Sequence, residues 1–282
     1  MAATRNALID WLRALAILMV ITVHTWSLAH ISSDTYPVLT IIYQCFYHCG
    51  VPLFVLLSGA LQLSAPIQPF GAFYKKRYTR ILIPFFIWSL IVYILSIIAG
   101  KYADIHTLKD ALIYYIPYLL TNRINEAYWF VGLIAALYLI TPLLQRDLQK
   151  RSRKELLLIC LCWLCYVIAC RTIPALYYSR FIYYVGFYVA GYILYREWGT
   201  LIHAKENKVI RAISDVSYMT YLMHMIFITP LYMLIGFSGE QAPLWACCIA
   251  PIGTSILVLC VCTTGGWIAK KIVPFYHYLG IN

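Results

Sequence analysis

Apolar runs of about 20 residues recur along the whole chain, and this repetition constrains the fold more than any other feature of the sequence. A bilayer core of roughly 30 Å is crossed by about 20 apolar residues in an α-helix. Hydrophobic residues fill 62% of the 282 positions, and the mean hydropathy is +0.75, which excludes a soluble domain. We therefore expect an all-α protein, a polytopic transmembrane helix bundle that forms one domain over residues 1–282.

The apolar runs predict eight spans, at residues 8–28, 42–63, 81–99, 128–145, 156–172, 180–196, 216–236 and 244–269. Lysine and arginine concentrate in the cytoplasmic loops of membrane proteins. With a cytoplasmic N-terminus, 16 cations fall in the inside segments and 5 in the outside segments. This bias predicts that both termini are cytoplasmic. It also accounts for the excess of 22 Lys and Arg over 11 acidic residues, so we expect no nucleic-acid partner.

Two segments differ from a simple span. The first run contains Arg13, is too long for a signal peptide and is followed by no small-residue cleavage site, so we expect it to remain as a span. The longest outside loop, 100–127, contains a short apolar stretch at 110–120. Its length and Pro117 predict an interfacial or re-entrant half-helix rather than a full crossing.

The first predicted span contains an arginine and a histidine, Arg13 and His24. At 3.6 residues per turn, the two side chains point within ~20° of each other and lie about 16 Å apart along the axis. A charge at the bilayer centre costs from about 3 to more than 10 kcal/mol, so such groups face a protein interior or a wet cavity. Alternatively, Arg13 reaches the cytoplasmic surface and pairs with Asp10, which leaves His24 unexplained.

A second polar cluster precedes the third predicted span, where Arg77 and Arg80 follow Lys75 and Lys76. The cluster can be read as an ordinary positive flank, which explains the charge but not the three-residue spacing. It can also be read as an anion clamp, because two guanidinium groups on one helix face suit phosphate oxygens.

Further candidates lie on the seventh predicted span and at the outer end of the fourth. Ser217, Tyr221 and His224 share one helix face and form either a substrate-binding surface or an interhelical hydrogen-bond network. Glu126 and Trp129 could orient and stack on a sugar, although an interfacial aromatic belt also explains Trp129.

Two more candidates lie in or beside the second predicted span. His48 could approach His24 or be a solvated histidine at a helix end. Ser58 and Gly59 are better explained by close helix packing than by a nucleophilic role.

Five segments, taken in order, resemble the type-three family of membrane acyltransferases. They are Arg13 and His24 with ten residues between them, "PLFVLLSGALQL" at 52–63, Arg77 and Arg80 with two residues between them, "YWFVGLIAALYLITPLL" at 128–144, and "SDVSYMTYLMH" at 214–224. The arginine–histidine pair is the most diagnostic of these elements.

The resemblance implies an O-acyltransferase that moves an acyl group, usually acetyl, from cytoplasmic acyl-coenzyme A to a hydroxyl of a cell-surface or lipid-linked glycan. We assign His24, Arg13 and Asp10 to the catalytic group, with His24 as general base or as an acylated intermediate. Arg77, Arg80, Lys76 and Arg13 are expected to bind acyl-coenzyme A. Substrate-binding residues are then Glu126, Trp129, His48, Tyr221 and His224.

The expected setting follows from the same resemblance. We expect a multi-pass protein of the bacterial inner (cytoplasmic) membrane, in contact with membrane lipids and capable of homo-oligomerisation. Acyl-coenzyme A is a co-substrate, and we expect neither a tightly bound cofactor nor a metal ion.

The chain departs from the family in length, because members typically have about ten spans, and we place the two missing helices before Ser214. Two other functions therefore remain open: a transporter or flippase component, and a non-catalytic subunit of a glycan-export assembly. Transport alone would not need the phosphate clamp at Arg77 and Arg80.

Overall fold

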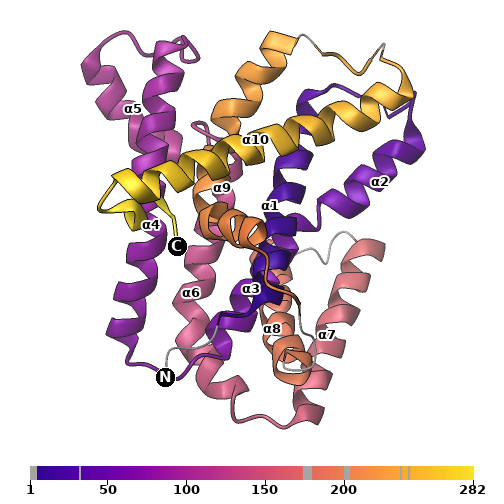
Figure 1. The fold of residues 1–282 in the computed structure, drawn as a ribbon. Coiled ribbons are helices and arrows are strands. Elements are labelled where there is room, and N and C mark those ends of the chain that lie inside the picture. The colour runs from indigo at the N-terminus through magenta and orange to yellow at the C-terminus, as the bar shows by residue number, and fades with distance from the viewer. Residues whose placement is uncertain (1–4, 32, 174–179, 200–203, 236, 241) are drawn as a thin grey trace.

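The computed structural model describes residues 5–31, 33–173, 180–199, 204–235, 237–240 and 242–282, and the regular elements in these ranges are all helices (Figure 1). In chain order they are α1 (Ala7–Leu28), α2 (Pro37–Tyr47), α3 (Gly50–Leu63), α4 (Phe70–Ile98), α5 (Leu108–Leu120), η1 (Glu126–Tyr128), α6 (Trp129–Leu148), α7 (Arg153–Thr172), α8 (Arg180–Trp198), α9 (Lys208–Ile235), α10 (Leu244–Ile272) and η3 (Tyr276–Leu279). The all-α fold expected from the sequence is confirmed.

Within the described ranges, six helical segments are long and apolar enough to cross a membrane. They are Ala7–Leu28, Pro37–Leu63, Phe70–Ile98, Glu126–Leu148, Lys208–Ile235 and Leu244–Ile272. The fifth and sixth predicted spans are helices too, α7 and α8, but they are not among these six. The five tyrosines of α8 lower its hydropathy. The count of eight spans and the cytoplasmic position of both termini therefore stay predictions.

The second predicted span, 42–63, is a broken helix that begins earlier than expected. Pro37 stands at the first turn of α2, where its missing N–H is not needed, and the helix stops at Tyr47. The next helix, α3, begins at Gly50, which lies against α1: a Cβ there would meet the Ala16 carbonyl oxygen at 3.0 Å. The break places His48 between two helices rather than inside one.

The predicted half-helix in the long loop is present as α5, which has 13 residues. Its first turn is capped reciprocally by Thr107 and Asp110, whose side chains each accept from the other residue's backbone N–H. Hydrogen bonds from Thr107 lower the pKa of the Asp110 carboxyl. The helix packs against α4.

The first helix, α1, lies inside the bundle, where it packs against α9, α3 and α10. Ala16, Ile17 and Ile21 on this helix are fully buried. Near its C-terminal end, the Thr25 hydroxyl lies 3.0 Å from the Pro251 carbonyl oxygen and 2.9 Å from the Ser255 hydroxyl on α10. These contacts fix the rotation of α1 about its axis. The last long helix, α10, lies across α1 and α9 (Figure 1).

The most extensive helix pair is α3 with α8, and two glycines bring it into close contact. A Cβ on Gly59 would lie 1.8 Å from the Tyr188 carbonyl oxygen, and one on Gly191 would lie 1.9 Å from the Leu56 carbonyl oxygen. Neither position can hold a larger residue without moving a helix backbone. The prediction that Ser58 and Gly59 serve helix packing is thus confirmed for Gly59.

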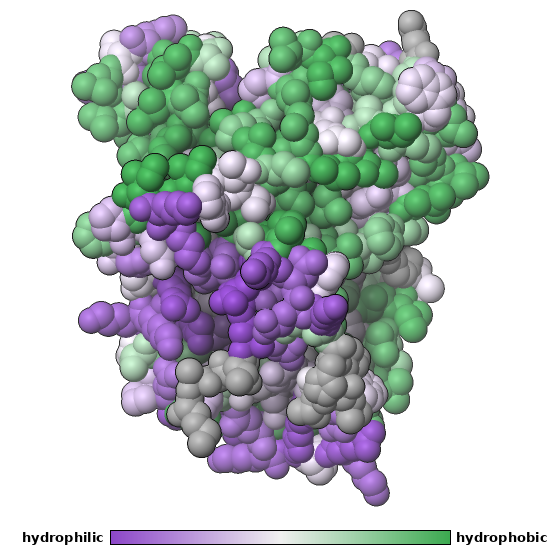
Figure 2. All heavy atoms as spheres, viewed as in Figure 1, coloured by the Kyte–Doolittle hydropathy of each residue, from purple (hydrophilic) through white to green (hydrophobic). Residues whose placement is uncertain are grey.

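The outer surface carries a large apolar area that suits hydrocarbon better than water. Exposed apolar side chains occur on most of the outward-facing helices, for example Val38, Ile98, Leu112, Leu161 and Ile249. Figure 2 shows apolar residues over the upper half of one face and hydrophilic residues gathered on its lower half. This separation is typical of a multi-pass membrane protein.

The contact between α3 and α8 makes a stability prediction. Gly191→Ala should destabilise the protein by about 1–3 kcal/mol, because the added methyl group overlaps the backbone of α3. The measurement is the midpoint of thermal unfolding of the purified protein in detergent.

A matched control is Gly253→Ala on α10, where an added Cβ meets nothing within 4 Å. This substitution should be neutral or slightly stabilising, because alanine has the better helix propensity. Equal midpoints for the two variants would contradict the proposed role of the close contact.

Candidate functional site

The first helix presents its two polar residues to two different cavities. His24 lines a cavity of about 750 Å³, which we call the histidine cavity. Arg13 lines a second cavity of about 190 Å³, which we call the arginine cavity. The sequence prediction that Arg13 and His24 face a protein interior rather than lipid is consistent with both positions.

The histidine cavity lies where the ends of several helices meet. Its lining comes from α1, the α2–α3 junction, α3 and the first residues of α6 and α8, with the end of α7. The lining residues are Val20, Val23, His24, Tyr47, His48, Val51, Trp129, Val167, Cys170, Arg180, Tyr183 and Tyr184. Three residues predicted from the sequence, His24, His48 and Trp129, are therefore brought together.

His24 is paired with a second histidine. The rings of His24 on α1 and His224 on α9 have centroids 5.0 Å apart. His224 is fully buried, and its Nδ1 lies 2.7 Å from the carbonyl oxygen of Tyr221. A carbonyl oxygen only accepts hydrogen bonds, so Nδ1 carries the proton and Nε2 of the neutral ring is an acceptor. That Nε2 is buried and has no hydrogen-bond partner in the described part of the chain.

The arginine cavity collects the cations predicted to bind a phosphate-bearing ligand. Arg13 on α1 and both Arg77 and Arg80 on α4 line it. The Nε of Arg77 is buried without a protein hydrogen-bond partner. Lys76 is exposed and is not part of the lining, because it lies on another face of α4. The three-residue spacing of Arg77 and Arg80 thus places this pair, and not the neighbouring lysine, on the cavity wall.

A layer of aromatic rings lies between the two cavities. Phe54, Phe130 and Tyr221 line the arginine cavity, and Phe130 contacts both other rings, at centroid distances of 6.3 Å and 5.2 Å. Tyr221 in turn contacts His224 at 5.9 Å, and His224 contacts His24. The Tyr221 hydroxyl donates to the Ala127 carbonyl oxygen, which fixes its ring. Continuous ring contacts therefore run from the arginine cavity to His24.

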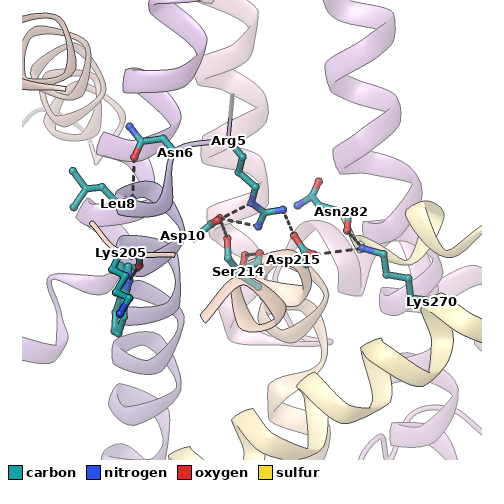
Figure 3. A network of polar contacts seen from close by, with 11 residues as sticks. Arg5, Asn6, Leu8, Asp10, Lys205, Ser214, Asp215, Lys270 and Asn282 are labelled. Carbon is teal, nitrogen blue, oxygen red and sulfur yellow. Dashed lines mark hydrogen bonds and ion pairs between the residues drawn. The ribbon is translucent and has the colours of Figure 1, made fainter. Parts of the chain in front are cut away.

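Asp10 lies outside both cavities and is part of an ion-pair network at the start of α1 (Figure 3). It pairs with Arg5 at 2.6 Å and accepts a hydrogen bond from Ser214 on α9 at 2.7 Å. Arg5 also contacts Asp215 at 2.6 Å, and Asp215 lies 3.4 Å from Lys270 on α10. The hydrogen bonds to Asp10, aided by those to Asp215, raise the pKa of Arg5.

The alternative in which Arg13 pairs with Asp10 is thus wrong, since the partner of Asp10 is Arg5. The structure also does not bring Asp10 to His24, so a catalytic role for Asp10 would have to be indirect. Its visible role is to hold the start of α1 against α9.

Glu126 stands at the edge of the histidine cavity. It is exposed and does not line the cavity, although it interacts electrostatically with His24, as does His48. Trp129, three residues later, contributes its ring to the wall.

Sequence reasoning missed three wall residues of the histidine cavity, Arg180, Tyr183 and Tyr184. They occupy the first turn or so of α8, and the Arg180 guanidinium lies 5.5 Å from the centre of the Trp129 ring. The signal was available in the "RFIYY" stretch at 180–184, where a cation and two adjacent tyrosines start a helix. In the count of loop charges, Arg180 is one of the five outside cations and has no further role.

Comparison with known proteins places this geometry in a family. The model of an acyltransferase domain matches residues 6–202, which is more than half of the chain and includes Arg13, His24, Arg77 and Arg80. No curated protein and no solved structure matches the chain. The chain therefore belongs to the type-three family of membrane acyltransferases.

Proposed function

We propose that this membrane acyltransferase is an O-acyltransferase. It takes an acyl group, expected to be acetyl, from cytoplasmic acyl-coenzyme A and transfers it to a hydroxyl of a cell-surface or lipid-linked glycan. We place it in the bacterial cytoplasmic membrane. One observation carries the proposal: guanidinium groups line one cavity, an imidazole pair lies beside the other, and aromatic contacts connect them.

The arginine cavity supports the binding of the donor. Coenzyme A carries phosphate groups, and guanidinium forks bind phosphate oxygens through two parallel hydrogen bonds. The buried Nε of Arg77 is a donor without a protein acceptor, which an anionic oxygen would satisfy. The cavity is small, so it suits the phosphate-bearing part of the donor and the start of its pantetheine arm.

The aromatic layer supports a path for the pantetheine arm. His24 lies about 16 Å further along α1 than Arg13, so the arm has to pass Phe54, Phe130 and Tyr221 to bring the thioester to His24. Apolar ring faces suit the uncharged arm and exclude water from the thioester. Exclusion of water protects the acyl group from hydrolysis.

His24 is the group placed to activate the acceptor. It lines the histidine cavity, where a hydroxyl can reach it. As the acceptor oxygen bonds to the acyl carbonyl carbon, the hydroxyl proton passes to His24 and the carbon–sulfur bond breaks. The proton then passes to the leaving sulfur, and coenzyme A departs as the thiol.

His224 supports this chemistry as a positioning residue. Its Nε2 is an acceptor without a protein partner, on a ring 5.0 Å from that of His24. An N–H of His24 directed toward this acceptor leaves the other ring nitrogen of His24 free to take the hydroxyl proton. This role requires the tautomer that the Tyr221 carbonyl oxygen imposes on His224.

The proposed base makes the first functional prediction. His24→Ala should lower transfer of radiolabelled acetyl from acetyl-coenzyme A to a glycan acceptor by about 10²–10⁴-fold, with little change in coenzyme A affinity. His106→Ala, in the loop before α5 and outside both cavities, is the control. Transfer by the His24 variant at the wild-type rate would rule out this mechanism, and movement of acceptor without acylation would favour the transport function.

The donor site makes a second prediction. Replacing both Arg77 and Arg80 by Gln should weaken equilibrium binding of acetyl-coenzyme A by about 100-fold or more, because two charge-assisted contacts are lost. Lys75→Gln removes a nearby exposed cation that does not line the cavity, and it should bind normally. The clamp is refuted if the double variant keeps the wild-type affinity.

The histidine pair makes a third prediction. His224→Leu should lower kcat by about tenfold or more while leaving the KM for acetyl-coenzyme A unchanged, since His224 acts through His24 and not on the donor. His224→Gln keeps a hydrogen-bond acceptor and should retain more activity than His224→Leu. An equal loss of kcat in the two variants would show that His224 contributes only through packing and not through its hydrogen-bond acceptor.

A further inference from the structure

The wall of the histidine cavity has an unbalanced charge. Among the lining residues that the structure describes, only Arg180 is formally charged at neutral pH, two others are histidines, and none is a carboxylate. Four of the lining side chains are aromatic: Tyr47, Trp129, Tyr183 and Tyr184. Glu126, which interacts electrostatically with His24, is exposed and lies outside the lining.

Arg180 is held in position by an aromatic ring, and its charge has no carboxylate partner among the described residues. Its guanidinium carbon lies 5.5 Å from the centre of the Trp129 ring, a cation–π contact that leaves the N–H donors at the rim of the guanidinium available. Within the described ranges, Arg180 forms no ion pair with a carboxylate. Arg123, in the loop after α5, differs in this respect, because it lies 3.4 Å from Asp104.

We propose that the acceptor glycan carries an anionic group, a carboxylate or a phosphate, and that Arg180 binds this group in the histidine cavity. The inference rests on the proposed function, because it names the class of acceptor for that reaction. A planar guanidinium binds either anion through two N–H donors. Trp129, which contacts Arg180 on one side, offers an aromatic face to the sugar ring carrying the anion.

The size and position of the cavity fit such a ligand. A volume of about 750 Å³ lies within the range of small-molecule sites and exceeds what an acyl group and one hydroxyl need. His24 and Arg180 come from different helices, α1 and α8, and line the same cavity. A saccharide can therefore place its anion at Arg180 while one of its hydroxyl groups faces His24, which selects the hydroxyl that is acylated.

The test uses the full-length protein in nanodiscs and three matched probes. These are a neutral disaccharide containing glucose, the same disaccharide with glucuronic acid in place of glucose, and the neutral disaccharide linked to a polyprenyl diphosphate. Equilibrium binding is measured for each probe, and acetyl transfer from acetyl-coenzyme A is measured in parallel. The second probe reports on a carboxylate, and the third on a phosphate.

Wild type should bind one of the two anionic probes at least tenfold more tightly than the neutral one. Arg180→Gln should weaken the binding of that anionic probe by about ten- to one-hundred-fold and leave the binding of the neutral probe unchanged. The affinity of Arg180→Lys for the anionic probe should lie between those of wild type and Arg180→Gln, since lysine keeps the charge and lacks the two parallel N–H donors of a guanidinium. Arg123→Gln removes an arginine that does not line the cavity and should match wild type.

Two results would overturn the inference. One is that wild type binds the neutral probe as tightly as the two anionic probes, or more tightly. The other is that Arg180→Gln loses as much affinity for the neutral probe as for the anionic probes. Binding is read out separately from transfer, so these results are distinct from a failure of the proposed function. That failure would be the absence of acetyl transfer to every probe by a wild-type protein that binds them.

Discussion

The close approach of α8 fixes the position of α3, a helix that lines both cavities. Helices in a bilayer gain little hydrophobic energy from association, because lipid chains are as apolar as their side chains, so van der Waals contact between backbones has to hold them. Gly59 and Gly191 supply that contact by removing the side chains between the two helices. The same α3 packs against α1 and α6, and all three helices contribute to the walls of both cavities.

The packing also decides which polar groups the bundle can hold. An arginine or histidine on a lipid-facing surface is costly, whereas one that faces a cavity keeps access to water or to a polar ligand. The structure places Arg13, Arg77 and Arg80 on one cavity and His24 and His48 on the other, and ring contacts through Phe130 connect the first cavity to His24. Apolar ring faces suit the uncharged arm of the proposed donor and exclude water from it.

Local periodicity allowed the helices and the main polar residues to be predicted. Arg13 and His24 lie on one helix, so a known rise and rotation per residue fixed their relative position, and the same holds for Arg77 and Arg80. Contacts between distant segments could not be predicted in this way. Arg5 rather than Arg13 pairs with Asp10, because α9 brings Asp215 to the same place and Arg5 bridges the two carboxylates.

The two missed features have separate physical causes. The break between α2 and α3 was missed because 42–63 is mostly apolar, so that its hydropathy predicts one continuous span, although Gly50 and Pro52 lie beside the break. Arg180 was missed because its importance comes from Trp129, about fifty residues away in the chain, and only the fold brings the two side chains together.

The part of the chain beyond the matched family segment completes the site. The match ends at residue 202, yet Tyr221 and His224 on α9 supply the end of the aromatic layer and the partner of His24. The helix is held to α1 at two places, by Ser214 and Asp215 at the ion-pair network and by the histidine pair further along. A short family member can thus keep the ring contacts from the arginine cavity to His24 as long as α9 stays docked on α1, since these contacts lie on these two helices and on α3 and α6.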